Sequence, residues 1–160
     1  MSTELKASSQ RVQAFLTQHG QEFSVVQMPD STRTAVEAAD AIGCTVAQIA
    51  KSLIFKNALT EEAILVVASG INQVCSDKVQ QATGFRLAKA NAAFVRDKVG
   101  FAIGGVPPVA HSNDVITLLD NDLLNYDEIW AAAGTPNSVF KLKPSDLSEL
   151  TGGQWLDVSK

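Results

Sequence analysis

The segment GGVPP, residues 104–108, joins two of the most flexible residues of the chain to two of the stiffest. Glycine lets a backbone amide approach a ligand closely, because no Cβ stands in the way. Each proline restricts the residue before it to extended conformations, so the prolines would fix the backbone conformation that the glycines allow. The amides of Gly104, Gly105 and Val106 are therefore candidate donors to a carbonyl oxygen or an oxyanion. The alternative is a tight connector between a helix and the strand that follows.

Lys51 is the second candidate for chemistry. In the predicted strand 51–57 its side chain shares a face with Leu53 and Phe55, because strand side chains alternate. An ammonium in line with two large apolar residues is partly desolvated, which favours an anionic or carbonyl partner. The alternative is a lysine at a strand end whose ammonium reaches water.

His111 lies three residues beyond the second proline and is a candidate acid, base or hydrogen-bonding group. A lone histidine without a placed partner is also compatible with a structural role. The sequence contains none of the motifs of serine hydrolases, P-loop nucleotidases or zinc enzymes. An enzyme without an obvious base acts on substrates that are already activated, such as esters.

No group of residues has the spacing of a metal site, and we expect neither a metal nor a cofactor. Cys44 and Cys75 fit no metal or redox motif and are interpreted as packed thiols. The acidic residues after the glycine–proline segment are interpreted as turn and cap residues; they are Asp114, Asp120, Asp122 and Asp127.

The composition favours a folded protein: of 160 residues, 46% are hydrophobic and 19% are charged. The net charge is −4, from 13 basic and 17 acidic residues, which argues against sequence-independent binding to DNA or other long nucleic acids. The longest apolar run, residues 63–68, is too short to span a bilayer, and the N-terminus lacks the apolar core of a signal peptide. We expect a cytoplasmic monomer with no membrane partner.

Local signals predict one α+β domain over residues 1–160. Capping boxes at Thr34/Glu37 and Thr45/Gln48 start a helix that ends at Gly43 and a short helix over 46–50. The fully apolar residues 63–68 indicate a central strand covered on both faces. The remaining predicted helices are 3–19, 75–82, 91–98 and 145–153, and the remaining predicted strands are 23–28, 85–88, 115–120, 128–134, 138–144 and 154–158.

Three separated blocks, residues 32–56, 100–111 and 133–152, resemble in order those of the YbaK/ProX family. Its members are free-standing relatives of the editing domain inserted in bacterial prolyl-tRNA synthetase. The resemblance implies an α+β fold with a mixed, partly barrel-like central sheet surrounded by helices. It also implies hydrolysis of the ester that joins a wrong amino acid to the 3′ end of a tRNA, most of all a small amino acid on proline tRNA.

The family's lysine at the start of a strand matches Lys51, and its G-x-x-x-P loop matches residues 104–108. The threonine of its TxxEAA block matches Thr34, and the third block, AGTPNS here, resembles the rim of its pocket. The resemblance thus implies catalytic roles for Lys51, Gly104 and Gly105. With His111 added from the residues themselves, the expected substrate-binding residues are Thr34, Val106, Pro108, His111, Gly134 and Asn137.

In the implied mechanism Lys51 holds the terminal phosphate or the ester region, and the 104–106 amides hold the carbonyl oxygen. The substrate's ribose hydroxyl, or a backbone carbonyl, activates the water, and pocket size rejects the cognate amino acid. The partner is the aminoacylated 3′ end of tRNA, with transient help from prolyl-tRNA synthetase or an elongation factor. The expected basic patch is Arg33, Lys51, Lys56, Lys141 and Lys143.

Two other functions remain open at this point. The same pocket would serve a non-catalytic module that binds aminoacyl-tRNA or a nucleotide-like ligand and regulates a partner. It would also serve a general esterase that acts on simple amino-acid esters without tRNA.

Overall fold

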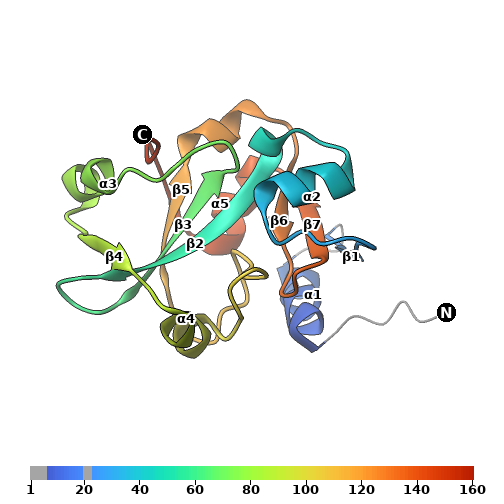
Figure 1. The fold of residues 1–160 in the computed structure, drawn as a ribbon, viewed down its shortest axis with the longest axis horizontal. Coiled ribbons are helices and arrows are strands. Elements are labelled where there is room, and N and C mark those ends of the chain that lie inside the picture. Colours follow the sequence, from blue (N-terminus) through green and yellow to red (C-terminus); the bar gives the residue numbers. More distant parts are fainter. Residues whose placement is uncertain (1–6, 20–22) are drawn as a thin grey trace.

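The computed structural model describes residues 7–19 and 23–160, which fold around one mixed eight-stranded sheet (Figure 1). The strand order is β1-β7-β6-β2-β3-β5-β8, and β4 adds to β2 beside this path. The pairs β2–β6, β3–β5 and β5–β8 are parallel, and the others are antiparallel. The prediction of an α+β fold with a mixed sheet is confirmed.

The elements follow the predicted order. The strands are β1 (Val25–Gln27), β2 (Ile49–Asn57), β3 (Ala63–Ser69), β4 (Leu87–Lys89), β5 (Ile116–Asp120), β6 (Ile129–Ala132), β7 (Ser138–Leu142) and β8 (Gln154–Leu156). The helices are α1 (Ala7–His19), α2 (Ala35–Ile42), α3 (Ser76–Thr83), α4 (Ala92–Val99) and α5 (Pro144–Thr151), with 3₁₀ turns η1 (Val46–Gln48) and η2 (Asn121–Asn125).

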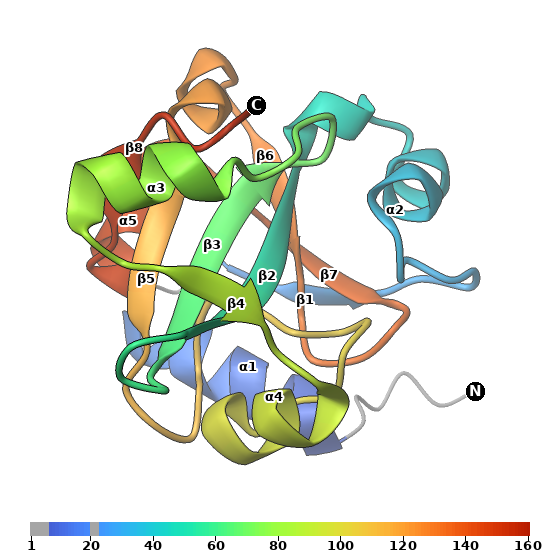
Figure 2. The ribbon, with the colours of Figure 1, turned by 60° about the vertical axis from the view of Figure 1, so that its left-hand side comes forward.

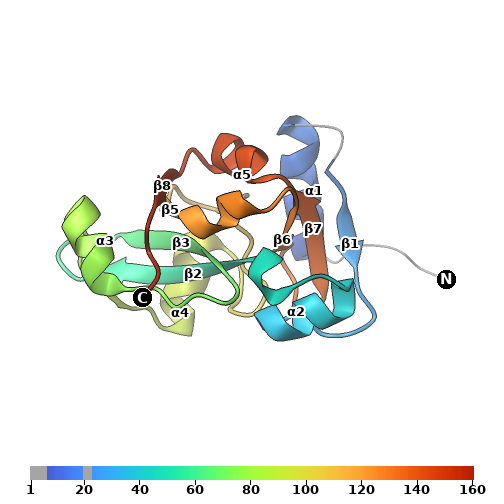
Figure 3. The ribbon, with the colours of Figure 1, turned by 90° about the horizontal axis from the view of Figure 1, so that it is seen from above.

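The helices cover both faces of the sheet. Side chains of α1, α4 and α5 enter the largest apolar cluster, together with Val67 of β3 and Phe140 of β7. On the opposite face α3 packs over Ile64 and Val66, and α2 packs over Ile49. Figure 3 shows α2 across the sheet from α1 and α5. Strand β3 is buried at every residue, as its apolar sequence predicts.

Local capping explains where α2 and η1 begin. The Thr34 hydroxyl accepts the Glu37 N–H, and the chain leaves α2 through Gly43 at φ 87°. The Gln48 side chain accepts the Thr45 N–H at 3.1 Å, which completes the second capping box. Both motifs satisfy amides that a helix start would otherwise leave unpaired. They deliver the chain into β2.

The structure corrects some predicted boundaries. The segment after Thr45 is a 3₁₀ turn, and residues 49–50 belong to β2, because they pair with β6 and β3. Strand β4 lies at Leu87–Lys89, slightly beyond the predicted 85–88. The turn η2 has no counterpart in the prediction. The beginning of the predicted helix 3–19 lies outside the described residues, and within the described ranges no helix is long and apolar enough to cross a membrane.

Candidate active site

A cavity of about 610 Å³ opens along one edge of β2. On this edge β2 pairs with β6 only at Ile49 and Ala50, and with β4 only from Phe55 onward. The strand therefore has no partner on this side over residues 51–54, all of which line the cavity. Figure 2 shows β4 crossing one end of β2, and Figure 1 shows β6 and α2 at the other. The site occupies a gap in the sheet.

The direction of the β2 peptide groups follows from two hydrogen bonds. The Asn57 N–H donates to Glu62 O across the β2–β3 hairpin, and the next amide, of Ala58, donates to Arg86 O on the opposite edge. Amides along a strand point alternately to its two edges. The N–H and C=O groups of Ser52 and Ile54 consequently face the gap.

Lys51 lies on this stretch of β2 and lines the cavity. Its side chain shares a sheet face with Phe55, which packs against the Ile64 and Val66 cluster. Lys51 is half-buried and forms no ion pair with any described residue. Burial lowers the pKa of the Lys51 ammonium below its usual value, while the charge of Asp120 opposes that lowering. A cation that lacks a protein partner is suited to bind an anion or a carbonyl.

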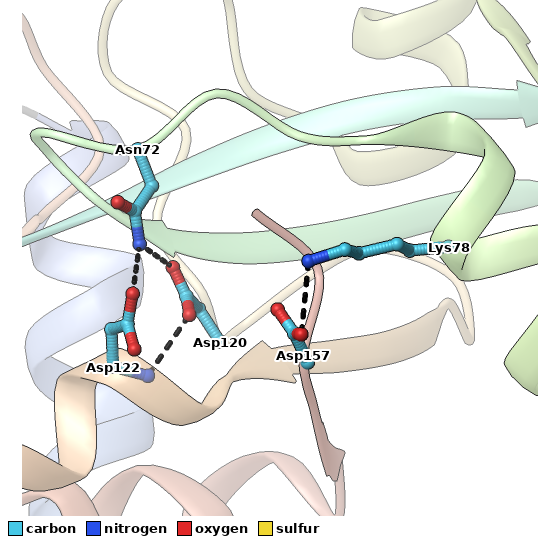
Figure 4. Close-up of polar contacts among 5 residues, drawn as sticks. All are labelled: Asn72, Lys78, Asp120, Asp122 and Asp157. Atoms are coloured by element: carbon cyan, nitrogen blue, oxygen red, sulfur yellow. Dashed lines mark hydrogen bonds and ion pairs between the residues drawn. The ribbon is translucent and has the colours of Figure 1, made fainter. Parts of the chain in front are cut away.

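Lys51, Ala68 and Asp120 form a row across three strands. Lys51 is paired with Ala68, and the β3–β5 register, extended by one residue, places Asp120 beside Ala68. Two strand spacings separate Lys51 from Asp120, which is about 10 Å between their Cα atoms. Asp120 is 1% exposed and accepts a hydrogen bond from Ser69 N at 3.0 Å. It also accepts hydrogen bonds from Asn72 Nδ2 (2.8 Å) and Asp122 N (2.9 Å) (Figure 4).

The glycine–proline segment meets the cavity at Gly104 and Val106 but not at Gly105. The Gly105 N–H donates to Ala102 O at 3.2 Å, and Gly105 O accepts the Gly134 N–H at 2.9 Å. A Cβ on Gly105 would lie 2.8 Å from the backbone of Thr135. Gly105 therefore packs against the 133–138 loop. The amides of Gly104 and Val106 donate to no acceptor among the described residues, so they are the two that remain for a substrate.

Two predicted residues at the start of α2 lie at the mouth of the cavity. Thr34 lines it, with its hydroxyl engaged in the α2 cap. Arg33 is exposed and lies over Gly104: a Cβ on Gly104 would come within 2.9 Å of Arg33 Nε. The guanidinium has no hydrogen-bond or salt-bridge partner among the residues that the structure describes.

Pro108 and His111 are not among the residues that line the cavity. Pro108 is buried, and His111 Nε2 donates to Pro107 O at 2.7 Å. Burial lowers the pKa of His111 below its usual value; the hydrogen bond to Pro107 opposes this lowering, and the charge of Arg11 adds to it. The contact joins His111 to Pro107, and neither residue lines the cavity.

Gly134 and Asn137 are also absent from the cavity lining. A Cβ on Gly134 would lie 2.7 Å from Ser8 O of α1, and its φ of 98° favours glycine. Asn137 Nδ2 donates to Met28 O at 3.2 Å, and Met28 N donates back to Asn137 O. The 133–138 loop thus ties the 104–106 segment to α1 and to the chain that enters α2.

Two features were not predicted. The first is Ser52, whose hydroxyl is buried without a hydrogen-bond partner among the described residues; the strand pattern placed it opposite Lys51 but could not show that this edge is unpaired. The second is the neutralisation of two expected patch lysines. Lys56 lies 4.0 Å from Glu61, and Lys141 lies 3.7 Å from Glu128.

The chemistry available at the cavity is narrow. The ionisable side chains among its lining residues are Arg33 and Lys51, so no carboxylate or imidazole of the described lining can act as a base. Within residues 7–19 and 23–160, no three metal-ligating side chains cluster. Cys44 and Cys75 are free thiols. The arrangement can hold an anion and polarise a carbonyl.

Comparisons with known proteins address the family. A model described as the aminoacyl-tRNA editing domain matches residues 29–150. The uncharacterized protein YwhH of Bacillus subtilis (strain 168) is 33% identical over 154 residues, which cover 96% of this chain and 98% of that protein. The crystal structure of a candidate trans-editing enzyme for prolyl tRNA synthetase is 44% identical, with a TM-score of 0.91, and covers 98% of this chain and 99% of its own.

A further solved structure, of the hypothetical protein APE2540, is 28% identical, with a TM-score of 0.86 over 94% of this chain and 99% of its own. These matches agree with the resemblance of the three sequence blocks and with the observed fold. The chain therefore belongs to the aminoacyl-tRNA editing domain family, within its YbaK/ProX group.

Proposed function

We propose that this protein is a trans-acting aminoacyl-tRNA deacylase that hydrolyses the ester of a mischarged tRNA. The observation that carries the proposal is that Lys51, Gly104 and Val106 line one cavity at a gap in the sheet, and that the amides of Gly104 and Val106 donate to no described acceptor. A cation and peptide donors are the groups that an ester needs for positioning and carbonyl polarisation.

The roles follow from what each group can bind. Lys51 holds the terminal phosphate or the ester region, and the amides of Gly104 and Val106 hold the carbonyl oxygen. Gly105, whose amide is engaged within the loop, supports the segment from behind. The ribose hydroxyl next to the ester activates the water, because an aminoacyl ester is already reactive and the described lining offers no base. Arg33 at the mouth meets a phosphate of the 3′ end.

The substrate we propose is proline tRNA that carries a small non-cognate amino acid. Support comes from the 44% identical structure described as a candidate trans-editing enzyme for prolyl tRNA synthetase. Alanine side chains in the cavity wall, such as Ala38 and Ala131, leave room for an acyl group and the terminal nucleotide. We further propose that the protein acts in the cytoplasm as a monomer, in transient contact with a synthetase or an elongation factor.

The test is a deacylation screen with a panel of mischarged tRNAs. Wild-type protein should hydrolyse at least one member, and Lys51→Met should lower its kcat/KM about a hundredfold or more, equivalent to about 3 kcal/mol of transition-state stabilisation. Lys56→Met is the matched control, because Lys56 lies on the same strand but faces Glu61. A wild type that binds aminoacyl-tRNA but hydrolyses no panel member would instead identify a non-catalytic binding module. Turnover of simple amino-acid esters at a rate equal to that of the tRNA substrate would identify a general esterase.

A further inference from the structure

The part of the cavity on the Ser52 side of β2 differs from its mouth. We call this part the inner pocket; its wall comprises Ala50, Ser52, Ile54, Val95, Val106 and Ala131. Ala50, Val95 and Ala131 are each 1% exposed, and Val106 is 7% exposed. Alternation along β2 puts the Ser52 side chain on the face of Ala50 and Ile54, which belongs to the main core. Ser52 carries the only polar side chain of this wall.

The Ser52 hydroxyl is unusual in its surroundings. Its oxygen is buried and has no hydrogen-bond partner among the described residues. By contrast, the hydroxyl of Ser69 on the adjacent strand donates to Ala47 O at 2.7 Å. A buried hydroxyl without a partner is unfavourable, so a ligand that enters the cavity is favoured if it completes the hydrogen bonding of Ser52. The position of Ser52 on a cavity wall indicates which kind of ligand that is.

The inner pocket lies next to the groups assigned to the ester. Lys51 and Ser52 are consecutive, with Cα atoms about 3.8 Å apart and side chains on opposite faces of β2. The strand has no partner at this edge, so a group seated there has the ammonium on one side and the hydroxyl on the other. An acyl group whose ester is held near Lys51 can therefore place its short side chain beside Ser52.

We propose that Ser52 is a specificity-determining residue that selects acyl groups with a side-chain hydroxyl, namely seryl and threonyl esters, over alanyl esters. This inference rests on the proposed function. A substrate hydroxyl exchanges a hydrogen bond with Ser52 Oγ inside an otherwise apolar wall, and both groups are satisfied. An alanyl ester fits the same space but leaves Ser52 Oγ unpaired, and a site built around a hydrogen bond rejects the analogue that lacks it.

The experiment compares seryl- and alanyl-tRNA carried on the same tRNA, with wild type and Ser52→Ala. We expect the ratio of kcat/KM for the seryl to the alanyl substrate to fall about five- to tenfold in Ser52→Ala, the effect of one neutral hydrogen bond. The melting temperature should stay the same or rise, because the variant removes an unsatisfied hydroxyl. The matched control Ser69→Ala removes a satisfied hydroxyl outside the cavity, so it should lower the melting temperature and leave the ratio unchanged.

Two outcomes overturn the inference while the proposed function stands. The first is an unchanged ratio in Ser52→Ala. The second is an equal loss of activity on both substrates, which would mean that Ser52 binds a group common to all aminoacyl esters. If wild type hydrolyses no aminoacyl-tRNA, the proposed function fails. Competition binding of non-hydrolysable seryl and alanyl adenosine amides then tests the role of Ser52 by itself. Preferred binding of the seryl amide that is lost in Ser52→Ala would support this role, and equal binding of the two amides to wild type would overturn it.

Discussion

Gly134 donates its N–H to the carbonyl oxygen of Gly105 at 2.9 Å, which joins two loops that are distant in sequence. Gly105 in turn lies so close to Thr135 that a Cβ on it would come within 2.8 Å of three backbone atoms. Backbone atoms cannot swing aside as a side-chain end can. The position of Gly104 and Val106 in the cavity wall therefore depends on a glycine that does not itself line the cavity.

Gly105→Ala should lower both stability and activity. Overpacking against Thr135 is expected to reduce the free energy of unfolding by about 1–3 kcal/mol and to displace the neighbouring amides, which reduces kcat/KM at least about tenfold. Thermal melting and deacylation kinetics measure the two effects. The control is Gly84→Ala at the end of α3, where φ is 82° and no atom lies within 4 Å of the added Cβ. That variant should lose about 1 kcal/mol of stability and keep its activity. Full activity in Gly105→Ala would contradict this account.

His111 should make stability depend on pH in a defined direction. Its pKa is lowered in the folded protein, chiefly by burial, so the unfolded chain binds a proton at higher pH than the native protein does. The contribution of His111 to stability is present above a pH of about 6.5 and is lost as the pH falls from there through the lowered folded-state pKa.

His111→Gln should flatten this part of the stability profile while its amide still donates to Pro107 O. Melting temperatures of both proteins between about pH 4.5 and 8 check the prediction. Because His111 lies outside the cavity lining, the pH profile of kcat/KM should change little. A large pH-dependent loss of kcat in the variant would show instead that His111 acts as an acid or a base.

Asp120→Asn should affect Lys51 from two strands away. The substitution removes the negative charge that opposes the effect of burial, so the pKa of Lys51 should fall further. If the ammonium form of Lys51 is required, the alkaline limb of the kcat/KM profile moves to lower pH. The variant should also lose about 1–3 kcal/mol of stability, because an amide group cannot accept all of the hydrogen bonds from Ser69, Asn72 and Asp122.

A control variant separates the effect of the Asp120 charge on Lys51 from a general loss of stability. Lys78 and Asp157 form an exposed pair at 3.0 Å on the same side of the sheet (Figure 4). Asp157→Asn should leave the alkaline limb in place and change stability little, because the ion pair is exposed. A limb that shifts equally in both variants would show that Asp120 has no specific influence on Lys51.

Arg33→Ala should weaken binding of the tRNA end without changing the chemical step. Arg33 is exposed at the mouth and has no ion-pair partner among the described residues, so it is free to contact a phosphate. We expect KM to rise about five- to tenfold with kcat nearly constant. The slope of log binding constant against log salt concentration should become shallower by about 0.7, the value for one contact with a single-strand phosphate. Lys141→Ala, whose target is already paired with Glu128, should change neither. An unchanged salt slope in Arg33→Ala would remove Arg33 from the binding surface.

Much of the local structure was predictable because its causes are local. The capping boxes at Thr34 and Thr45 lie within a few residues of the amides that they satisfy, and the glycine at 43 adopts the left-handed conformation that ends α2. Likewise, the apolar run in β3 marks a strand with no exposed face. Alternation along β2 placed Lys51 on the face of Phe55, as the structure has it.

The site itself depends on contacts between segments that are distant in sequence. The gap beside Lys51 and Ser52 exists because β6 leaves β2 after Ala50 and β4 joins it only at Phe55, and neither event is encoded near those residues. Gly104 and Gly105 are neighbours with the same side chain, yet one borders the cavity and the other packs against Thr135. The sequence by itself determined the elements, their order and the candidate lysine and loop. Only the tertiary structure decided which of their groups share a cavity, because strand pairing and loop packing are set by partners far along the chain.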